Sequence, residues 1–452
     1  MHPTIFELNA FGRSRLPGAQ GRAVLRHLRQ GCARCRAAIS TRLALWLDEG
    51  PAAEARASDP RRHGRALVAE HLRAAARAFR AASKLRRPPD ADVDVDQARV
   101  ILEAEGPVAI GRMPRRLLGP PAIEALLHAT STLGAPDPRL RLRFAELAYD
   151  LAHRDPSDER RARELRCRAG VELANAHRVL DDLRLAQEEL DRAREELLRG
   201  DHDPLVAARL LVIQALVMCG PYHLVASREL LSAAMRIYRR RALLQDLARA
   251  SVSAANVLHY AGRFDAALQS RREALEVLDR EREPESAAAA IIGLSSALAE
   301  LGRWQEALDI LRRERTFVTA HCHGKNASRD AQLEGRLLAR AGDMQGAVRA
   351  FASSRGMFTA QSSLYDAGIV SLFWAGALEE RGDWDGSRAR IMEGTELIMK
   401  CRPQGEIYTT AILLRTTRQF SATRDALPLD RLIRFLYRAE FDPDVRLHSF
   451  LA

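Results

Sequence analysis

The chain has little cysteine, few aromatic residues and no long hydrophobic run. Its six cysteines among 452 residues are too few and too scattered for a disulfide framework, and they fit a reducing compartment better. No segment approaches the roughly 18 apolar residues that span a bilayer, and the beginning of the chain lacks the pattern of a secretory signal peptide. We therefore expect a cytoplasmic protein that does not enter the membrane.

Sequence motifs of the common enzyme classes are missing as well. We find no phosphate-binding glycine loop, no strand-turn-helix nucleophile elbow, no HExxH and no recognisable pair of catalytic carboxylates. Aromatic residues make up only 5% of the chain, whereas Ala, Leu and Arg are abundant, which is typical of long helices that pack through small residues. The sequence predicts an all-α protein that is not an enzyme.

The positive charge is unevenly distributed along the chain. Residues 1–90 contain 18 Lys and Arg against 7 Asp and Glu, so the whole net charge of +11 lies in this segment. Such a segment attracts acidic partners or nucleic acid, although arginine-rich helices with a solvated face would have the same composition. An acidic stretch follows Pro88 and predicts a linker, because it comes directly after two prolines.

Four short segments further along repeat one another at a spacing of forty residues. Each has a glycine that permits a tight turn, a large apolar residue two positions later and a small residue three positions after that. The large residue can fill the space between two helices, and the small one lets them approach closely, which predicts a helical hairpin. The glycines are Gly262, Gly302, Gly342 and Gly382.

These segments resemble the tetratricopeptide repeat family, in a longer form of about forty residues. The resemblance implies a right-handed superhelix of antiparallel helix pairs that binds a protein or peptide in its concave groove. We divide the chain into a zinc-knuckle module (1–50), a basic helical segment (51–90), a linker and irregular helical region (91–135), the repeat array (136–424) and a C-terminal cap and tail (425–452).

In this family the first helix of each hairpin lines the groove, and counting back from the repeat glycines in helical steps gives its exposed face. Guanidinium groups one turn apart with amides between them could hold a carboxylate or an acidic peptide. Arginines paired with Glu334 or Glu300 on a solvated face are the other explanation. The predicted groove residues are Arg249, Asn256, Arg329, Gln332, Arg336 and Arg340.

A second motif lies near the start of the chain, where His27 is followed by Cys32 and Cys35. Two thiolates separated by two residues can bind one ion, and a turn at Gly31 would bring the imidazole alongside. The motif predicts a structural zinc site. Two incidental cysteines, or a thiol redox switch favoured by the many arginines, are the alternatives.

This motif is similar to the zinc-binding domain of anti-sigma factors, in which a histidine, three residues and CxxC lie between short helices. Here His27 and Cys32 have four residues between them, and His2 is the predicted fourth ligand. The resemblance implies a bacterial regulator whose N-terminal module contacts a transcription-related partner such as a sigma factor, while the repeats bind a protein or peptide. The alternative function is nucleic-acid binding through the basic residues 1–90.

Overall fold

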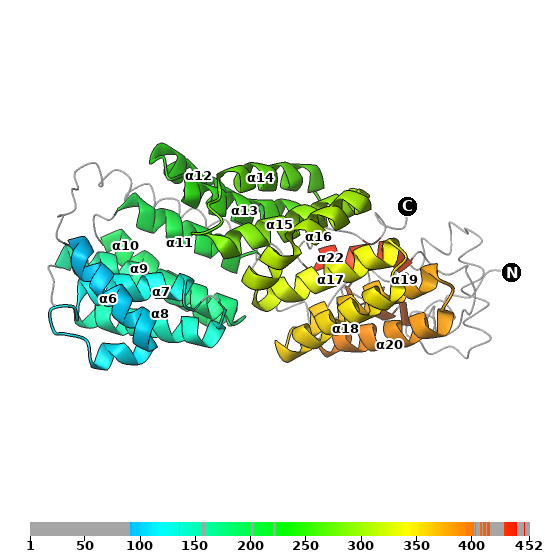
Figure 1. Ribbon diagram of the computed structural model, residues 1–452, viewed down its shortest axis with the longest axis horizontal. Coiled ribbons are helices and arrows are strands. Elements are labelled where there is room, and N and C mark those ends of the chain that lie inside the picture. Colours follow the sequence, from blue (N-terminus) through cyan, green and yellow to red (C-terminus); the bar gives the residue numbers. More distant parts are fainter. Residues whose placement is uncertain are drawn as a thin grey trace, which may run out of the picture. The chain divides into compact units, whose positions relative to one another are not determined.

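The computed structural model describes residues 91–440 and Leu447, apart from 135, 156–158, 200–202, 220–222, 402, 404–406, 409, 413 and 416–428. This part of the chain is helical and contains no strand, so the all-α prediction is confirmed for it (Figure 1). None of its helices is both long and apolar enough to cross a membrane. The described residues form two compact units: an N-terminal unit (91–302 with Ile310–Gly324) and a C-terminal unit (Arg303–Asp309 with residues from 325 onward).

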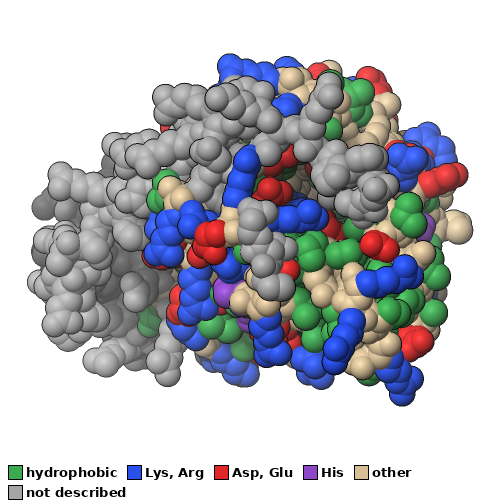
Figure 2. Space-filling view, turned by 90° about the vertical axis from the view of Figure 1, so that its left-hand side faces the viewer, with side chains coloured by type: hydrophobic (Ala, Val, Ile, Leu, Met, Phe, Trp, Pro, Cys, Tyr) green, Lys and Arg blue, Asp and Glu red, His purple; other side chains and the backbone are tan. Residues whose placement is uncertain are grey.

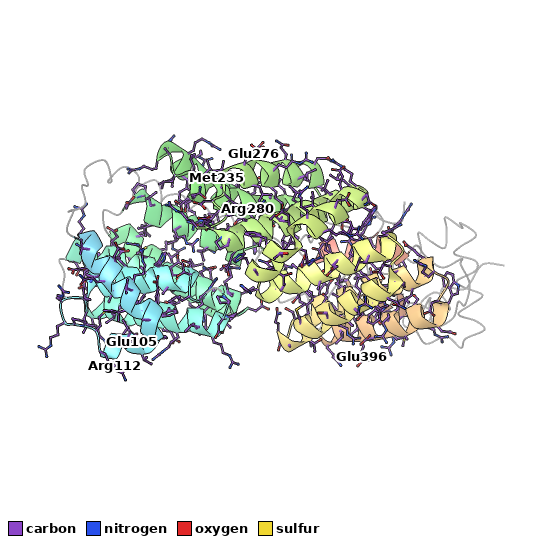
Figure 3. All side chains as sticks on the ribbon, in the orientation of Figure 1. Glu105, Arg112, Met235, Glu276, Arg280 and Glu396 are labelled. Carbon is purple, nitrogen blue, oxygen red and sulfur yellow. The ribbon has the colours of Figure 1, made fainter. Side chains whose placement is uncertain are left out.

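The N-terminal unit begins with helix α6 (Ala91–Glu105), the short 3-10 helix η2 (Gly106–Gly111) and α7 (Pro120–Ser131). The linker predicted after Pro88 is therefore wrong from Ala91 onward. Ala98 and Leu102 of α6 are buried in a cluster with α7, and a helix forms when one face is buried even if its other face is acidic. Glu105 and Arg112, at the two ends of η2, form an exposed ion pair of 3.8 Å (Figure 3).

Aspartate followed by proline begins two of the next helices, which are α8 (Pro138–Arg154), α9 (Glu159–Val179), α10 (Leu183–Arg199) and α11 (Pro204–Val217). The Asp137 carboxylate accepts a hydrogen bond from the backbone N–H of Arg139 at 2.9 Å, and Asp203 accepts one from Leu205 at 3.0 Å. Proline suits the first helical position because its missing N–H would have no partner there. These starts are thus specified locally.

From α12 to α20 the helices follow a regular spacing. Each of these nine helices begins twenty residues after the one before. Two successive helices fill forty residues, which is the repeat length that the glycine spacing predicted. Their bounds are α12 (Leu224–Arg240), α13 (Leu244–Tyr260), α14 (Phe264–Val277), α15 (Pro284–Glu300), α16 (Trp304–His321), α17 (Gly324–Arg340), α18 (Met344–Ala360), α19 (Leu364–Glu380) and α20 (Trp384–Lys400).

Many of the turns between these helices share one backbone conformation, whereas α14 is followed by Leu278 in an extended conformation. The repeat glycines have φ angles between 73° and 89°, in the left-handed region that glycine adopts without strain. At Gly342 the N–H bonds to the carbonyl of Ala339 at 3.1 Å, and the next N–H, of Asp343, bonds to that of Leu338 at 3.0 Å. This pair of bonds is a Schellman motif, which satisfies the last carbonyls of the helix. Ala242 and Ser362 take the same conformation in other turns.

The residues after each repeat glycine pack as the sequence predicts. The four large residues are partly buried, and the four small ones are buried with at most 1% of their surface exposed. The small residues let paired helices approach closely, so the hairpin prediction is confirmed. The large residues are Phe264, Trp304, Met344 and Trp384, and the small ones are Ala267, Ala307, Ala347 and Ser387.

Two glycines bring α19 and α20 into close contact in the C-terminal unit. A Cβ atom added at Gly368 would lie 2.7 Å from the backbone oxygen of Gly394, and one added at Gly394 would lie 2.8 Å from that of Gly368. The side chain of Ile398 packs on the same spot. The backbones of α19 and α20 are thus in direct contact at these two positions, and only glycine allows so close an approach.

A final helix, α22 (Leu429–Ala439), lies within the predicted C-terminal cap. Its buried residues include Leu432, Ile433 and Phe435, and they share a cluster with Leu372 of α19. The hydroxyl of Tyr365 on α19 donates a hydrogen bond to the carbonyl of Leu436 at 2.8 Å. The chain therefore packs its last described helix against α19, the first helix of the last hairpin.

Candidate functional site

Alternate helices line one side of the N-terminal unit. Each helix packs most closely on its neighbour in sequence, but α9, α11, α13 and α15 also contact one another in succession. When every second helix of a chain contacts the next in this way, those helices form the inner layer of a stack of hairpins. The side chains on these four inner helices are therefore the first candidates for a binding surface.

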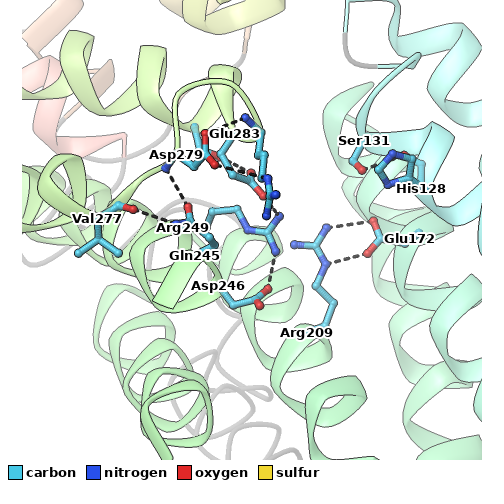
Figure 4. A network of polar contacts seen from close by, with 12 residues as sticks. His128, Ser131, Glu172, Arg209, Gln245, Asp246, Arg249, Val277, Asp279 and Glu283 are labelled. Atoms are coloured by element: carbon cyan, nitrogen blue, oxygen red, sulfur yellow. Dashed lines mark hydrogen bonds and ion pairs between the residues drawn. The ribbon is translucent and has the colours of Figure 1, made fainter. Parts of the chain in front are cut away.

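Ion pairs connect the inner helices to one another. Arg209 on α11 donates two hydrogen bonds to the Glu172 carboxylate on α9, at 2.7 and 3.0 Å. Arg249 on α13 pairs with Asp246 one turn away and with Glu283 at 2.7 Å. Figure 4 shows both arginine side chains pointing toward the same space from different helices. A two-bond contact between a guanidinium and a carboxylate fixes both groups in position.

The electrostatics of Glu172 follow from this geometry. Burial by itself would raise the pKa of Glu172, but the charge and hydrogen bonds of Arg209 hold that pKa below its usual value. Glu172 is therefore a carboxylate at neutral pH that binds Arg209 through both of its oxygens.

The first helices of the N-terminal unit also reach this inner surface. Arg141 on α8 lies 3.4 Å from the carboxylate of Glu285 on α15, although 144 residues separate them in sequence. Burial and Arg99 lower the pKa of His128 on α7, and the Glu103 and Glu283 carboxylates act in the opposite direction. Figure 4 shows His128 beside Ser131 of the same helix. The Arg141 side chain thus connects α8 to α15 within the N-terminal unit.

Two of the predicted groove residues lie on α13. Arg249 belongs to the network just described. Asn256 accepts a hydrogen bond from Arg271 at 2.8 Å, and Arg271 is only 2% exposed, so the Asn256 side chain is occupied by a buried contact between α13 and α14. Both were predicted as groove residues; the structure places Arg249 in the inner-surface network and Asn256 in a contact between α13 and α14.

The C-terminal unit contains a pocket between α17 and α19. Arg336 lies with its guanidinium carbon 4.4 Å from the ring centre of Phe373 and 5.6 Å from that of Trp304. Arg340 lies 5.1 Å from the Trp304 ring and forms an ion pair of 3.0 Å with Glu380. The lining residues are Trp304, Arg336, Ala339, Arg340, Phe351, Phe373, Gly376, Ala377, Glu380, Asp430, Ile433 and Arg434. An arginine held between two aromatic rings is positioned rigidly.

The other predicted residues of α17 are placed differently. Gln332 is buried, with 8% of its surface exposed, and Arg329 is partly buried. Neither lines the pocket. Of the four residues predicted on this helix face, the structure brings together Arg336 and Arg340.

Helix α22 supplies part of the pocket wall, which the sequence did not predict. Asp430, Ile433 and Arg434 line it beside the residues of α17 and α19. Ile433 approaches Gly376 closely, since a Cβ atom added there would lie 3.7 Å from its side chain. The face of α19 thus already accommodates an amphipathic helix of the same chain.

The predicted zinc ligands His2, His27, Cys32 and Cys35 lie outside the described residues. Within residues 91–440, as far as they are described, no group of three His, Cys, Asp or Glu side chains is arranged to hold a metal ion. The zinc site therefore stays a prediction.

Stacked antiparallel hairpins with a polar inner layer define a helical repeat protein. Residues 246–318, from α13 into α16, match the tetratricopeptide repeat family, as the glycine spacing predicted for this segment. No protein with curated annotation matches the chain.

Three solved structures are similar in their helical arrangement. The Rap conjugation gene regulator of the plasmid pLS20 in complex with the Phr* peptide is 12% identical, with a TM-score of 0.48, and the match covers 89% of this chain and 97% of that one. The Rap protein complexed with Competence and Sporulation Factor is 15% identical, with a TM-score of 0.45, and the match covers 77% of this chain and 100% of that one. The apo form of RapI is 13% identical, with a TM-score of 0.43, and the match covers 62% of this chain and 98% of that one.

Proposed function

We propose that this protein is a non-enzymatic regulator that binds a protein or peptide segment on the inner helices of its repeats. The observation that carries this proposal is the pocket of the C-terminal unit, where α22 already packs as a helix against α19. Amphipathic helices commonly bind to other proteins in this way, with the apolar face in a groove.

The residues of the pocket suit a protein partner. Arginine and tryptophan are the side chains that contribute most often to binding energy at protein interfaces, and here Arg336 and Arg340 are both stacked on Trp304. The acidic Glu380 and Asp430 lie beside them, so the pocket offers apolar surface with both signs of charge. A partner segment with an apolar anchor can pack on the ring surface, and the charged residues at the edge of the pocket can contact its polar groups.

The test compares two tryptophans at the same repeat position. Trp304 lines the pocket, whereas Trp384 begins α20 and does not line it. Full-length wild-type protein, Trp304→Ala and Trp384→Ala are used as baits in extracts of the native cell, with quantitative mass spectrometry. We expect at least one partner that the wild type and Trp384→Ala retain and that Trp304→Ala loses at least tenfold. Identical partners for all three baits would contradict the role of the pocket.

We also propose that His2, His27, Cys32 and Cys35 hold one structural zinc ion and that this module contacts a transcription-related partner. Support comes from the ligand spacing in the sequence alone. Metal analysis of purified protein should find about one zinc per chain, lost in a Cys32→Ser, Cys35→Ser variant. Recovery of an RNA-polymerase component with the full-length wild type, but not with that variant, would support the partner.

The basic residues 1–90 favour nucleic-acid binding as the second candidate function. Duplex DNA binding by the full chain that weakens steeply with salt would support it. No binding at low salt would exclude it.

A further inference from the structure

The outer face of α6 exposes apolar side chains. Val93 and Val100 are 61% and 63% exposed, and their spacing of seven residues places them on the same face of the helix. Val108 in the adjoining η2 is 69% exposed. Of the large hydrophobic side chains that the structure describes, only Val225 is as exposed as these three. In the view onto this end of the N-terminal unit, hydrophobic side chains lie at the surface among charged ones (Figure 2).

Helix α6 is also the first helix of the described stack. It packs mainly on α7 and η2, where Ala98 and Leu102 are buried, and no other described helix packs extensively on its opposite face. The terminal helix of a stack of hairpins needs a cover for any apolar surface that it presents. In the C-terminal unit α22 covers α19 in this way. The face of α6 therefore needs a cover from another segment.

The same helix is acidic. Its sequence contains five Asp and Glu against one Arg. The Asp96 side chain, one turn from Val100, is 70% exposed, and Glu103 is exposed as well. A segment that suits this face has apolar side chains in a line and basic side chains beside them.

The chain immediately before α6 has these two properties. Residues 61–87, which lie outside the described residues, contain nine Lys and Arg against one Glu. Apolar residues recur in this segment at intervals of three and four, which is typical of one face of a helix. They are Val68, Leu72, Ala75, Phe79 and Ala82. Only residues 88–90 separate the segment from Ala91, and a connection of this length joins antiparallel helices.

We propose that residues 61–87 form a helix that docks antiparallel on the exposed face of α6, with its apolar line against Val93 and Val100. The segment completes the first hairpin of the stack and buries the valines. The acidic residues of α6 then lie beside the basic segment, so an anionic partner of residues 1–90 has to compete with α6. This contact belongs to the N-terminal unit, and its test is independent of the pocket around Trp304.

The experiment compares two valines of equal exposure in the thermal unfolding of the full-length protein. Val100→Gln places an amide on the face of α6, whereas Val225→Gln places one on α12, where Val225 is 64% exposed. Glutamine is uncharged, so neither variant changes the net charge. We expect Val100→Gln to lower the Tm by at least about 4 °C, because the amide is buried without a partner, and Val225→Gln to change it by less than about 2 °C. Equal Tm values for the two variants would overturn the proposal.

A double-mutant cycle identifies the segment that covers the face. Phe79→Gln should also lower the Tm, and its combination with Val100→Gln should lose much less than the sum of the two single variants, because each substitution breaks the same contact. Additive losses, or no loss in Phe79→Gln, would contradict the docking. A loss in Val100→Gln that varies with protein concentration would assign the face to a second copy of the chain and would also contradict it. If Val100→Gln does not fold, Val93→Gln takes its place in both comparisons.

Discussion

The close contact between α19 and α20 predicts that one substitution, Gly368→Ala, lowers the free energy of unfolding. In Gly368→Ala the new methyl group would lie 2.7 Å from the backbone oxygen of Gly394 and equally close to Ile398, and the backbone atom cannot move aside cheaply. Alanine is favoured over glycine in a helix by about 1 kcal/mol, but overpacking of this kind costs about 1–3 kcal/mol and sometimes more. With two close contacts, we expect a net loss of at least about 1 kcal/mol in the free energy of unfolding.

The matched control is Gly356→Ala, in the C-terminal half of α18. A Cβ atom added at Gly356 meets no other atom within 4 Å, so only the gain in helix propensity remains. This variant should be more stable than the wild type by about 0.5–1 kcal/mol. Thermal unfolding should separate the two variants by several degrees, since about 1 kcal/mol corresponds to roughly 2–4 °C for a domain of this size. Equal shifts in the same direction would refute the close approach of α19 and α20.

Three further predictions concern single groups. Asp343 accepts a hydrogen bond from the N–H of Gly346 at 2.8 Å, so Asp343→Ala should cost about 1 kcal/mol in a urea titration. Glu172→Gln should lower stability by about 1–3 kcal/mol at pH 7. Because the pKa of Glu172 is lowered in the folded state, wild-type stability from its pair with Arg209 is present above the usual value of 4.5 and is lost as the pH falls further, so the two proteins should converge in acid. Burial raises the pKa of the Cys167 thiol far above its usual range, so iodoacetamide at pH 8 should label Cys167 only after unfolding.

The hairpin array was predictable because its turns depend on local chemistry. A left-handed residue ends four of these helices, and glycine supplies it at Gly262, Gly302, Gly342 and Gly382. The turn between α9 and α10 uses Asp181 with a φ of 68°, so the same geometry carries no glycine signal there. Helix α6 was missed for a different reason: its acidic face is visible in the sequence, whereas the burial of Ala98 depends on helices that come later.

The candidate sites were only partly predictable. Counting back from Gly342 located Arg336 and Arg340, because helical spacing alone places them on one face. Phe373 and the residues of α22 reach the same pocket from other helices, and no local pattern shows this. The repeat length could have predicted Arg209 as an inner-surface residue. Arg209 precedes Arg249 by forty residues and therefore occupies the same position one repeat earlier.

The uniform spacing of α12 to α20 has a consequence for how such a chain can change its length. Any forty-residue segment taken from this region begins and ends at equivalent structural positions. One such segment can be lost or duplicated by a single recombination event while every remaining turn keeps its own residues and every inner helix keeps its face. The number of inner helices, and with it the length of partner that the protein can cover, is therefore adjustable in whole steps.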